Sequence, residues 1–459
     1  MGFRCALTVA GVLAAVLGCG APAHAVETGV NETLGQTVPT EQKASHLGAD
    51  WVRLWASWEA LQPTPGAYEG HVVDATNAHV AALKARGVKV LVVVHRSPAW
   101  ASRGYGGIAP PADPVSFAAF MRGLAQRVPA VDAWEVWNEP DSPGFFRDAP
   151  QPGAYAAMLR AVYPAIKSVQ PGDAVITGGM VGNDMDFLQA LYDHGAQGAF
   201  DAVGVHTDTA CLTNGPDIHY RDERGRIGRY TFSAYREVHA VMADHGDGAK
   251  PIWMTEIGWN TQSTRRQSCN TGTWAGKKRI GVSEKRQARF LRAAYRCVAA
   301  DPFVGPVIWF GLQDIPVAGH SRGFGLYRRN GSAKPAARAF RRLDRGIRPR
   351  RGCGGAVDRI PPTLRIDEPL DGARFARRLT VRVSAADNPG GAGLGRINLE
   401  ADGRHIRSWG TAHGEIKPWW ATENWRPGLH TLSFHVLDKA QNEASVTVRV
   451  EKLRRSSNR

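Results

Sequence analysis

One theme repeats along the first three quarters of the sequence: a short apolar run, a polar loop, and then a longer segment with helical periodicity. Seven of the runs are predicted strands, at residues 51–55, 88–94, 133–137, 174–177, 202–205, 252–255 and 304–310. An eighth, the first in the chain, is expected at residues 27–31. Runs that are apolar throughout are typical of a parallel sheet covered by helices. Eight such units predict a (β/α)8 TIM barrel, of the α/β class, over residues 26–345.

The segments between the predicted strands have apolar residues at three- and four-residue spacing, as amphipathic helices do. The clearest of them are residues 74–86, 114–127, 153–168, 231–245 and 283–299. They are long enough to cross back over a parallel sheet, which supports the barrel prediction.

The pattern changes near the C-terminal end. Residues 346–357 are basic and contain several glycines, which predicts a solvated linker. Residues 358–453 then alternate apolar and polar side chains between Asp-Gly and Asn-Pro-Gly-Gly turns, which predicts a small all-β sandwich, followed by a tail at 454–459. The segments DRIPPTLRIDEP (358–369) and LTVRVSAADN (379–388) resemble bacterial immunoglobulin-like modules appended to exported enzymes.

Charge does not indicate a nucleic-acid-binding protein. The formal net charge is +15, but it is spread over the chain and no motif or interleaving of aromatic and basic residues concentrates it. Residues 346–459 carry +8 of it. That excess favours anionic cell-wall polymers as a partner of the C-terminal module.

The first 25 residues have the pattern of a secretory signal peptide. Arg4 provides the positive charge, residues 6–17 form a short apolar segment, and Ala23-His24-Ala25 is a small-x-small cleavage site. The alternative is a lipid anchor on Cys19, because residues 16–19 resemble a bacterial lipoprotein cleavage site. No later segment reaches the ~18 apolar residues of a spanning helix, so the expectation is a secreted protein without a transmembrane segment.

Four cysteines remain after cleavage at Ala25. An even number in an exported protein predicts two disulfide bonds, and the alternative is free buried thiols. Cys211 and Cys269 follow adjacent predicted strands, and Cys297 lies near the end of the last helix before the final strand. Four cysteines allow three pairings, which the sequence cannot separate. The hypothesis that this adjacency motivates is Cys211–Cys269, with Cys297 reaching Cys353 in the predicted linker.

Two glutamates follow predicted strands. The run 133–137 leads into Asn138-Glu139-Pro140, and the run 252–255 leads into Glu256-Ile257-Gly258. Their separation of 117 residues is about three barrel units, which assigns them to the fourth and seventh strands. Both side chains then lie at the C-terminal face of the barrel, where such enzymes carry their active sites. Glycosidic cleavage uses two carboxyl groups placed in this way: one protonates the leaving oxygen, and the other attacks the sugar.

These two motifs resemble those of the clan A retaining glycoside hydrolases, a superfamily of cellulase-like and family 39 β-xylosidase-like barrels. The likeness spans about residues 27–343. It implies that Glu139 is the acid/base, that Glu256 is the nucleophile, and that Asn138 holds the sugar 2-hydroxyl. It implies no metal and no cofactor.

Other strand ends match the resemblance. It implies that Arg53 supports the nucleophile, that His95 and His206 bind sugar hydroxyls, and that Trp309 forms the floor of the reacting subsite. The positive charge of Arg53 is expected to keep Glu256 ionised, while the second carboxylate and the nearby Trp137 are expected to raise the pKa of Glu139.

One position departs from the pattern. Cellulase-like relatives commonly carry His-x-Tyr on the sixth strand, where the tyrosine hydrogen-bonds the nucleophile, but this chain has His206-Thr207-Asp208. Either another group such as Tyr220 replaces that tyrosine, or the surroundings of the nucleophile differ. The segment Ser97-Pro98-Ala99-Trp100-Ala101 and the Asn-Glu-Pro-Asp form of the acid/base motif favour the family 39 side.

The function predicted from the sequence is thus a secreted retaining glycoside hydrolase acting on an oligosaccharide, polysaccharide or glycoconjugate. Two alternatives remain open. One is a non-catalytic carbohydrate-binding or cell-wall protein on the same barrel, which the presence of both glutamates disfavours. The other is a transglycosylating enzyme, because water and sugar acceptors use the same two carboxylates.

Overall fold

A computed structural model describes residues 26–33, 39–208, 215–219, 222, 224–261, 281–315, 323–343, 346–347, 360–389, 393–410, 415–416, 419–422, 424–438 and 442–454. The predicted signal peptide with Cys19, most of the predicted linker, Tyr220, and Cys211, Cys269 and Cys353 lie outside these residues. Cys297 is buried on helix α8 and forms a disulfide bond whose partner is also outside them. The two cysteine pairings therefore stay predictions.

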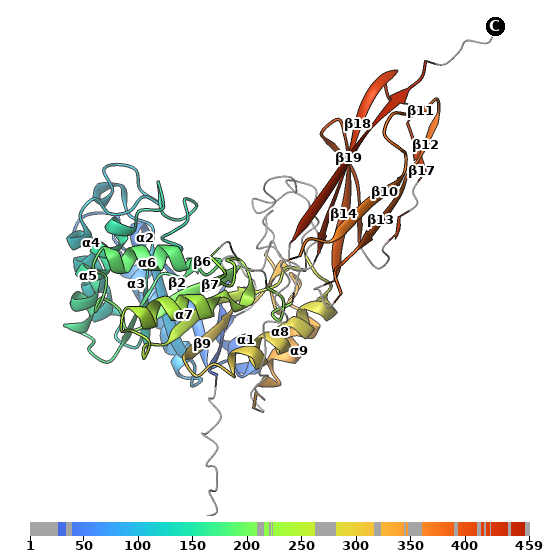
Figure 1. The fold of residues 1–459 in the computed structure, drawn as a ribbon. Coiled ribbons are helices and arrows are strands. Elements are labelled where there is room, and N and C mark those ends of the chain that lie inside the picture. Colours follow the sequence, from blue (N-terminus) through green and yellow to red (C-terminus); the bar gives the residue numbers. More distant parts are fainter. Residues whose placement is uncertain are drawn as a thin grey trace, which may run out of the picture.

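The N-terminal part of the chain forms the predicted barrel (Figure 1). Its strands are β1 (Thr28–Asn31), β2 (Trp51–Ser57), β3 (Lys89–His95), β4 (Ala133–Val136), β5 (Ala174–Thr177), β6 (Met180–Val181), β7 (Val203–Asp208), β8 (Ile252–Gly258) and β9 (Val304–Trp309). All neighbouring strands in this sheet are parallel, in the order β5-β4-β3-β2-β1-β9-β8-β7-β6.

The nine strands occupy eight positions around the barrel, here called staves. This is because β5 and β6 are two pieces of one strand, which is interrupted at Gly178-Gly179. The barrel closes where Ile176 of β5 pairs in parallel with Ala202, just before β7. The seventh stave is therefore β8. This confirms the (β/α)8 fold and the strand numbers predicted for Glu139 and Glu256.

Helices surround the sheet (Figure 1). They are α1 (Thr40–Leu47), α2 (Trp58–Leu61), α3 (Gly70–Lys84), α4 (Pro114–Arg127), α5 (Pro152–Lys167), α6 (Met185–Asp193), α7 (Tyr235–Asp244), α8 (Glu284–Val298) and α9 (Pro335–Phe340). The start of α4 shows why its ends could be predicted. Asp113 accepts a hydrogen bond from the Val115 N–H, and Pro114 occupies the first helical position. Among the described residues no helix is long and apolar enough to cross a membrane.

Two layers of side chains inside the barrel prepare the site. The lower layer is apolar and consists of Trp51, Leu91, Ala133, Ile176, Ala202, Trp253 and Ile308. Side chains alternate along a strand, so the residues two positions further along β2, β4 and β8 also point inward. These residues are Arg53, Glu135 and Thr255, all completely buried. A charged layer thus lies directly above the apolar one.

The C-terminal part is all-β, as predicted. Its strands are β10 (Thr363–Glu368), β11 (Ala373–Phe375), β12 (Arg378–Thr380), β13 (Arg382–Ala386), β14 (Leu394–Ala401), β15 (Arg404–Gly410), β16 (Glu415–Ile416), β17 (Trp419–Ala421), β18 (Gly428–Asp438) and β19 (Glu443–Lys452). They form sheets of five, three and two strands. Val381, Val383, Leu399, Leu432, Phe434 and Val450 contribute to the core between them.

Candidate active site

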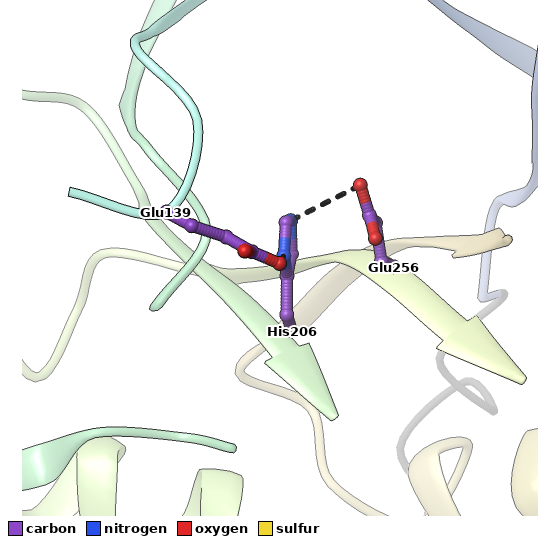
Figure 2. A group of neighbouring side chains, drawn as sticks. All are labelled: Glu139, His206 and Glu256. Atoms are coloured by element: carbon purple, nitrogen blue, oxygen red, sulfur yellow. Dashed lines mark hydrogen bonds and ion pairs between the residues drawn. The ribbon is translucent and has the colours of Figure 1, made fainter. Parts of the chain in front are cut away.

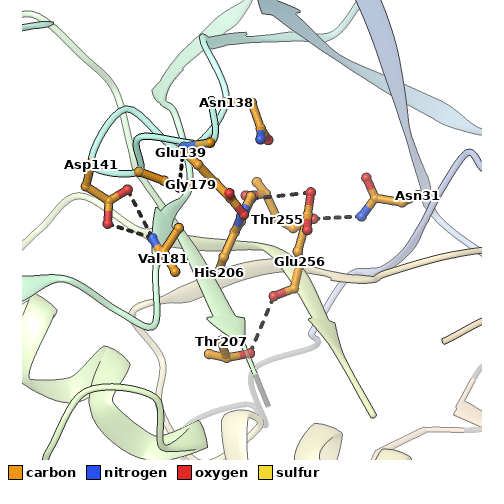
Figure 3. Close-up of polar contacts among 12 residues, drawn as sticks. Asn31, Asn138, Glu139, Asp141, Gly179, Val181, His206, Thr207, Thr255 and Glu256 are labelled. Atoms are coloured by element: carbon orange, nitrogen blue, oxygen red, sulfur yellow. Dashed lines mark hydrogen bonds and ion pairs between the residues drawn. The ribbon is translucent and has the colours of Figure 1, made fainter. Parts of the chain in front are cut away.

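The loop that follows β4 has an unusual backbone. Trp137 and Glu139 both have positive φ angles, of 70° and 44°. Such angles are costly for residues other than glycine and are often found at functional sites. The indole of Trp137 is fully buried and donates to the carbonyl of Phe145 at 2.8 Å, which anchors the loop. The strained turn directs Glu139 toward His206 (Figure 3).

Glu139 and Glu256 face each other with His206 between them (Figure 2). His206 Nδ1 lies 2.9 Å from a carboxylate oxygen of Glu139, and its Nε2 lies 3.6 Å from Oε1 of Glu256. One oxygen from each glutamate and a ring nitrogen of His206 all lie within 4.8 Å of one another. The two glutamates keep 18% and 13% of their side chains exposed, whereas His206 is buried at 2%. The structure therefore brings together the two carboxyl groups that the sequence paired.

His206 was expected to bind sugar hydroxyls, but the structure places its ring between the two glutamates. The pairing of β7 with β8 shifts register between Val205 and His206, so that His206 pairs with Glu256. The hydroxyl of the next residue, Thr207, donates to the main-chain carbonyl of Glu256 at 3.4 Å (Figure 3). His206 thus contacts the nucleophile candidate where cellulase-like relatives use a tyrosine.

Arg53 is the cation beneath the site, as expected. It is completely buried, and its Nη1 donates to Oε1 of Glu256 at 2.7 Å and to Oδ1 of Asn31 at 2.9 Å. Its Nη2 donates to the side-chain oxygen of Asn138 at 2.8 Å. Asn31 in turn donates to the Thr255 carbonyl at 2.8 Å, which ties β1 to the strand that carries Glu256. Arg53 therefore fixes both the nucleophile candidate and the side chain of Asn138.

Arg53 acts on the pKa of Glu256 in the expected direction, but its charge is not the largest influence. Burial is the largest influence and raises the pKa of Glu256 to about 7, although His206 and Arg53 act in the opposite direction. Glu139 and Glu135 raise it further. The sequence could not give this balance, because it did not show that Glu135 also shares the charge of Arg53.

His95 ends β3, where it was predicted. Burial lowers its pKa to about 3, and the cations of Arg53 and Arg96 act in the same direction. Its ring is therefore neutral over the pH range in which enzymes work. Its Nδ1 is buried and has no hydrogen-bond partner in the structure.

Trp309 does not match its predicted role. Its side chain is completely buried, its indole donates to the carbonyl of Phe324 at 2.9 Å, and its ring packs against Trp259. A ring that forms the floor of a sugar subsite needs an open face. In this structure Trp309 is part of the core beside β8 instead.

Asp141, two residues after Glu139, is a neighbour that the sequence analysis missed. Its carboxylate accepts the Val181 N–H, at 3.2 and 3.0 Å to its two oxygens (Figure 3). Arg229 lies 3.6 Å away, and also pairs with Asp184 at 2.5 Å. Burial raises the pKa of Asp141 to about 8, and the carboxylates of Asp184 and Glu139 raise it as well. In the sequence, the Asn-Glu-Pro-Asp motif was the feature that could have indicated Asp141 as a neighbour of Glu139.

Gly179, in the break between β5 and β6, was also missed. A Cβ atom at this position would lie 2.1 Å from Cδ2 of His206 and 2.7 Å from the hydroxyl oxygen of Thr255. Only glycine leaves room for the His206 ring. The Gly178-Gly179 pair after a predicted strand was the signal in the sequence.

Replacing Gly179 by alanine is therefore expected to displace His206 and to lower kcat by about 10- to 100-fold, with a loss of stability of about 1–3 kcal/mol from overpacking. Kinetics on an aryl glycoside and thermal unfolding would measure both effects. Gly172→Ala is the control, because nothing lies within 4 Å of a Cβ atom there. Unchanged kinetics in Gly179→Ala would show that the ring position does not matter.

Glu139, His206 and Glu256 also form a candidate set of ligands for a cation. However, Nη1 of Arg53 already lies 2.7 Å from Glu256. A second positive charge beside the guanidinium would be repelled, so the charges favour acid–base chemistry over metal binding.

Comparisons with known proteins agree with this geometry. The family model described as cellulase, glycosyl hydrolase family 5, matches residues 19–198, which include Glu139. No curated protein sequence matches the chain. A solved family 39 glycoside hydrolase from Bacteroides cellulosilyticus WH2 is 19% identical, with a TM-score of 0.54 over 86% of this chain and 79% of its own.

Two solved enzymes of family 5, subfamily 18, are also similar. The one from Streptomyces cattleya is 21% identical, with a TM-score of 0.53 over 72% of this chain and 83% of its own. The one from Bifidobacterium longum subsp. infantis is 14% identical, with a TM-score of 0.51 over 76% of this chain and 82% of its own. At these identities the structural similarities establish the fold, while the family model and the two glutamates point to the chemistry.

Proposed function

We propose that the chain is a glycoside hydrolase of clan A, which cleaves O-glycosidic bonds with retention of configuration through a covalent intermediate on Glu256. The observation that carries this proposal is the short separation of the two carboxylates, whose oxygens approach within 4.8 Å. Retaining enzymes hold their carboxyl groups ~5–5.5 Å apart, whereas inverting enzymes need ~6.5–9.5 Å to admit a water molecule.

In the first step Glu256 attacks the anomeric carbon while Glu139 protonates the leaving oxygen. The new bond is the ester between Glu256 and the sugar, and the bond that breaks is the glycosidic C–O bond. In the second step Glu139 takes a proton from water, which attacks the anomeric carbon and releases Glu256 as a carboxylate. The proton is therefore returned to Glu139 and no net charge is lost.

The assignment of the two roles follows from their neighbours. Glu256 is the carboxylate that accepts from Arg53, which orients it and stabilises the charge that returns when the ester is cleaved. Glu139 lies against His206, near Asp141. Asn138 and the neutral ring of His95 are proposed to hold the sugar.

Covalent trapping tests this function. A 2-deoxy-2-fluoro glycoside with an activated leaving group should form a stable ester, because the fluorine slows both steps while the activated leaving group keeps the first step fast. After proteolysis, mass spectrometry is expected to place the adduct on the peptide that contains Glu256. Glu256→Gln serves as the control and should remain unlabelled. Labelling elsewhere in the wild-type protein would refute the assignment.

The pH dependence of kcat/KM should reflect the raised pKa of Glu256. The nucleophile works only as a carboxylate, so kcat/KM is expected to rise tenfold per pH unit below about pH 7. At higher pH kcat/KM should fall again, where Glu139 loses the proton that it donates to the leaving group. The pKa read from this acid limb belongs to the coupled pair of Glu139 and Glu256 rather than to either residue alone. Measuring kcat/KM from pH 4 to 10 decides the point: an acid limb below pH 5 would mean that Arg53 and His206 outweigh burial.

The enzyme is further proposed to act outside the cell. The signal-peptide pattern of residues 1–25 supports export, either as a secreted protein or anchored through Cys19. The +8 charge of residues 346–459 supports contact with anionic wall polymers. Cell-wall binding by the full-length protein that does not weaken as salt rises would contradict an electrostatic contact.

A further inference from the structure

The mechanism leaves one buried charged side chain without a role. Glu135 lies on β4, four residues before Glu139, and is completely buried in the middle of an apolar run. A buried carboxylate is costly unless it is paired and hydrogen-bonded. Its neighbours on the same strand, Trp134 and Val136, are ordinary core residues. The charge therefore calls for an explanation beyond packing.

Glu135 has three partners, each on a different stave. Arg53 of β2 donates to both of its oxygens, from Nε at 2.5 Å and from Nη2 at 3.1 Å. The Gly179 N–H donates at 2.9 Å, and the Thr255 hydroxyl lies at 3.3 Å. The carboxylate is thus held from three sides, and its two-point contact sets the plane of the Arg53 guanidinium.

The plane of the Arg53 guanidinium determines which of its N–H groups reach Glu256 and Asn138. With Nε and one side of the guanidinium committed to Glu135, Nη1 is directed at Glu256 and Asn31, and Nη2 also reaches Asn138. A lysine or a freely rotating arginine would not hold these three partners together. The orientation of the nucleophile therefore depends on Glu135 through Arg53.

The charges give Glu135 a second effect. The single positive charge of Arg53 is shared between the carboxylates of Glu135 and Glu256. If Glu256 had this cation to itself, the attack on the sugar would have to give up a stronger interaction, which raises the barrier. Sharing the charge leaves Glu256 oriented but more reactive.

We propose that Glu135 is a positioning residue for the nucleophile: it fixes the Arg53 guanidinium and takes up part of its charge, so that Glu256 is both oriented and reactive. The kinetic part of this inference rests on the proposed role of Glu256. The charged groups that face Glu256 are Arg53 from β2, Glu135 and Glu139 from the β4 region, and His206 from β7. The charged or titratable groups that face Glu135 are Arg53, Glu256 and the hydroxyl of Tyr155 on α5.

A titration that needs no substrate tests the electrostatic part. Carboxyl-labelled glutamate followed by carbon-13 NMR reports the ionisation of Glu256, and its signal is assigned by its loss in Glu256→Gln. Replacing Glu135 by glutamine is expected to lower the titration midpoint of Glu256 by about one pH unit, because a like charge is removed and Arg53 is no longer shared. An unchanged midpoint in a folded Glu135→Gln protein would overturn the proposal.

The kinetic part uses two further variants. Glu135→Gln should shift the acid limb of kcat/KM to lower pH, as it shifts the titration midpoint of Glu256. It should also lower kcat about tenfold or more. The shorter side chain in Glu135→Asp keeps the negative charge but cannot reach Arg53, Gly179 and Thr255 together. This variant should therefore lower kcat and change the acid limb of kcat/KM little. If Glu135→Gln does not fold, a kcat within twofold of wild type in Glu135→Asp would by itself overturn the positioning role.

The matched control is Glu284→Gln. Glu284 accepts two hydrogen bonds from Arg328, at 2.8 and 2.5 Å, and both side chains of this pair are partly exposed. Glu284→Gln should leave unchanged both the titration midpoint of Glu256 and the acid limb of kcat/KM. If the wild-type enzyme cleaves no glycoside while the midpoint of Glu256 still moves in Glu135→Gln, the proposed function fails and the electrostatic inference survives.

Discussion

Replacing Glu256 by alanine is expected to reduce hydrolysis by about 10⁴-fold or more, because the variant lacks the carboxylate proposed to form the ester with the sugar. The cavity left by the side chain also admits small anions. Azide should therefore restore part of the turnover with an activated aryl glycoside. The azide attacks directly from the side of Glu256 in one displacement, so the glycosyl azide should have inverted configuration.

The control for Glu256→Ala is Glu69→Ala, an exposed glutamate before α3 that should keep full activity. Thermal unfolding should show that both variants are folded. A product of retained configuration from Glu256→Ala with azide would mean that another residue is the nucleophile.

Replacing Glu139 by alanine is expected to act through the leaving group. For glycosides with poor leaving groups, the loss of general acid catalysis should cost about 10²–10⁴-fold in kcat/KM. For dinitrophenyl glycosides, which leave without protonation, kcat/KM should change little. Their second step lacks its base, so the glycosyl-enzyme should accumulate as a burst of released phenol.

Azide distinguishes the two glutamates. In Glu139→Ala it should attack the intermediate on Glu256 and give a glycosyl azide of retained configuration, the opposite of the result for Glu256→Ala. A series of aryl glycosides with leaving groups of graded acidity measures the first effect. If the loss in Glu139→Ala is the same for every leaving group, Glu139 is not the acid.

The sequence predicted the barrel because its eight units repeat one pattern and because strands buried on both sides are apolar throughout. It also placed Glu139 and Glu256 on the correct staves, since their spacing counts whole units. The break between β5 and β6 was not predicted, because Gly178-Gly179 could equally have ended the strand. Helices α1 and α6 are short and were not among the clearest periodic segments.

The contacts inside the site were harder to predict. The pairing of Arg53 with Glu135 joins residues 82 positions apart, and only the closed barrel shows that both point into the same layer. The position of His206 depends on a register shift between β7 and β8 and on the close approach of its ring to Gly179, and only the folded barrel shows the shift and this contact. Trp309 was assigned from the resemblance alone, and its burial depends on packing against Trp259.

The central claim is that two carboxylates within 4.8 Å work by double displacement, and the configuration of the first product tests it most directly. Proton NMR of a hydrolysis reaction, recorded before mutarotation, shows which anomer of the sugar is released first. A sugar released with the configuration of the substrate is the predicted result. If the first-formed sugar has the opposite configuration, water attacks directly and Glu256 is not a nucleophile.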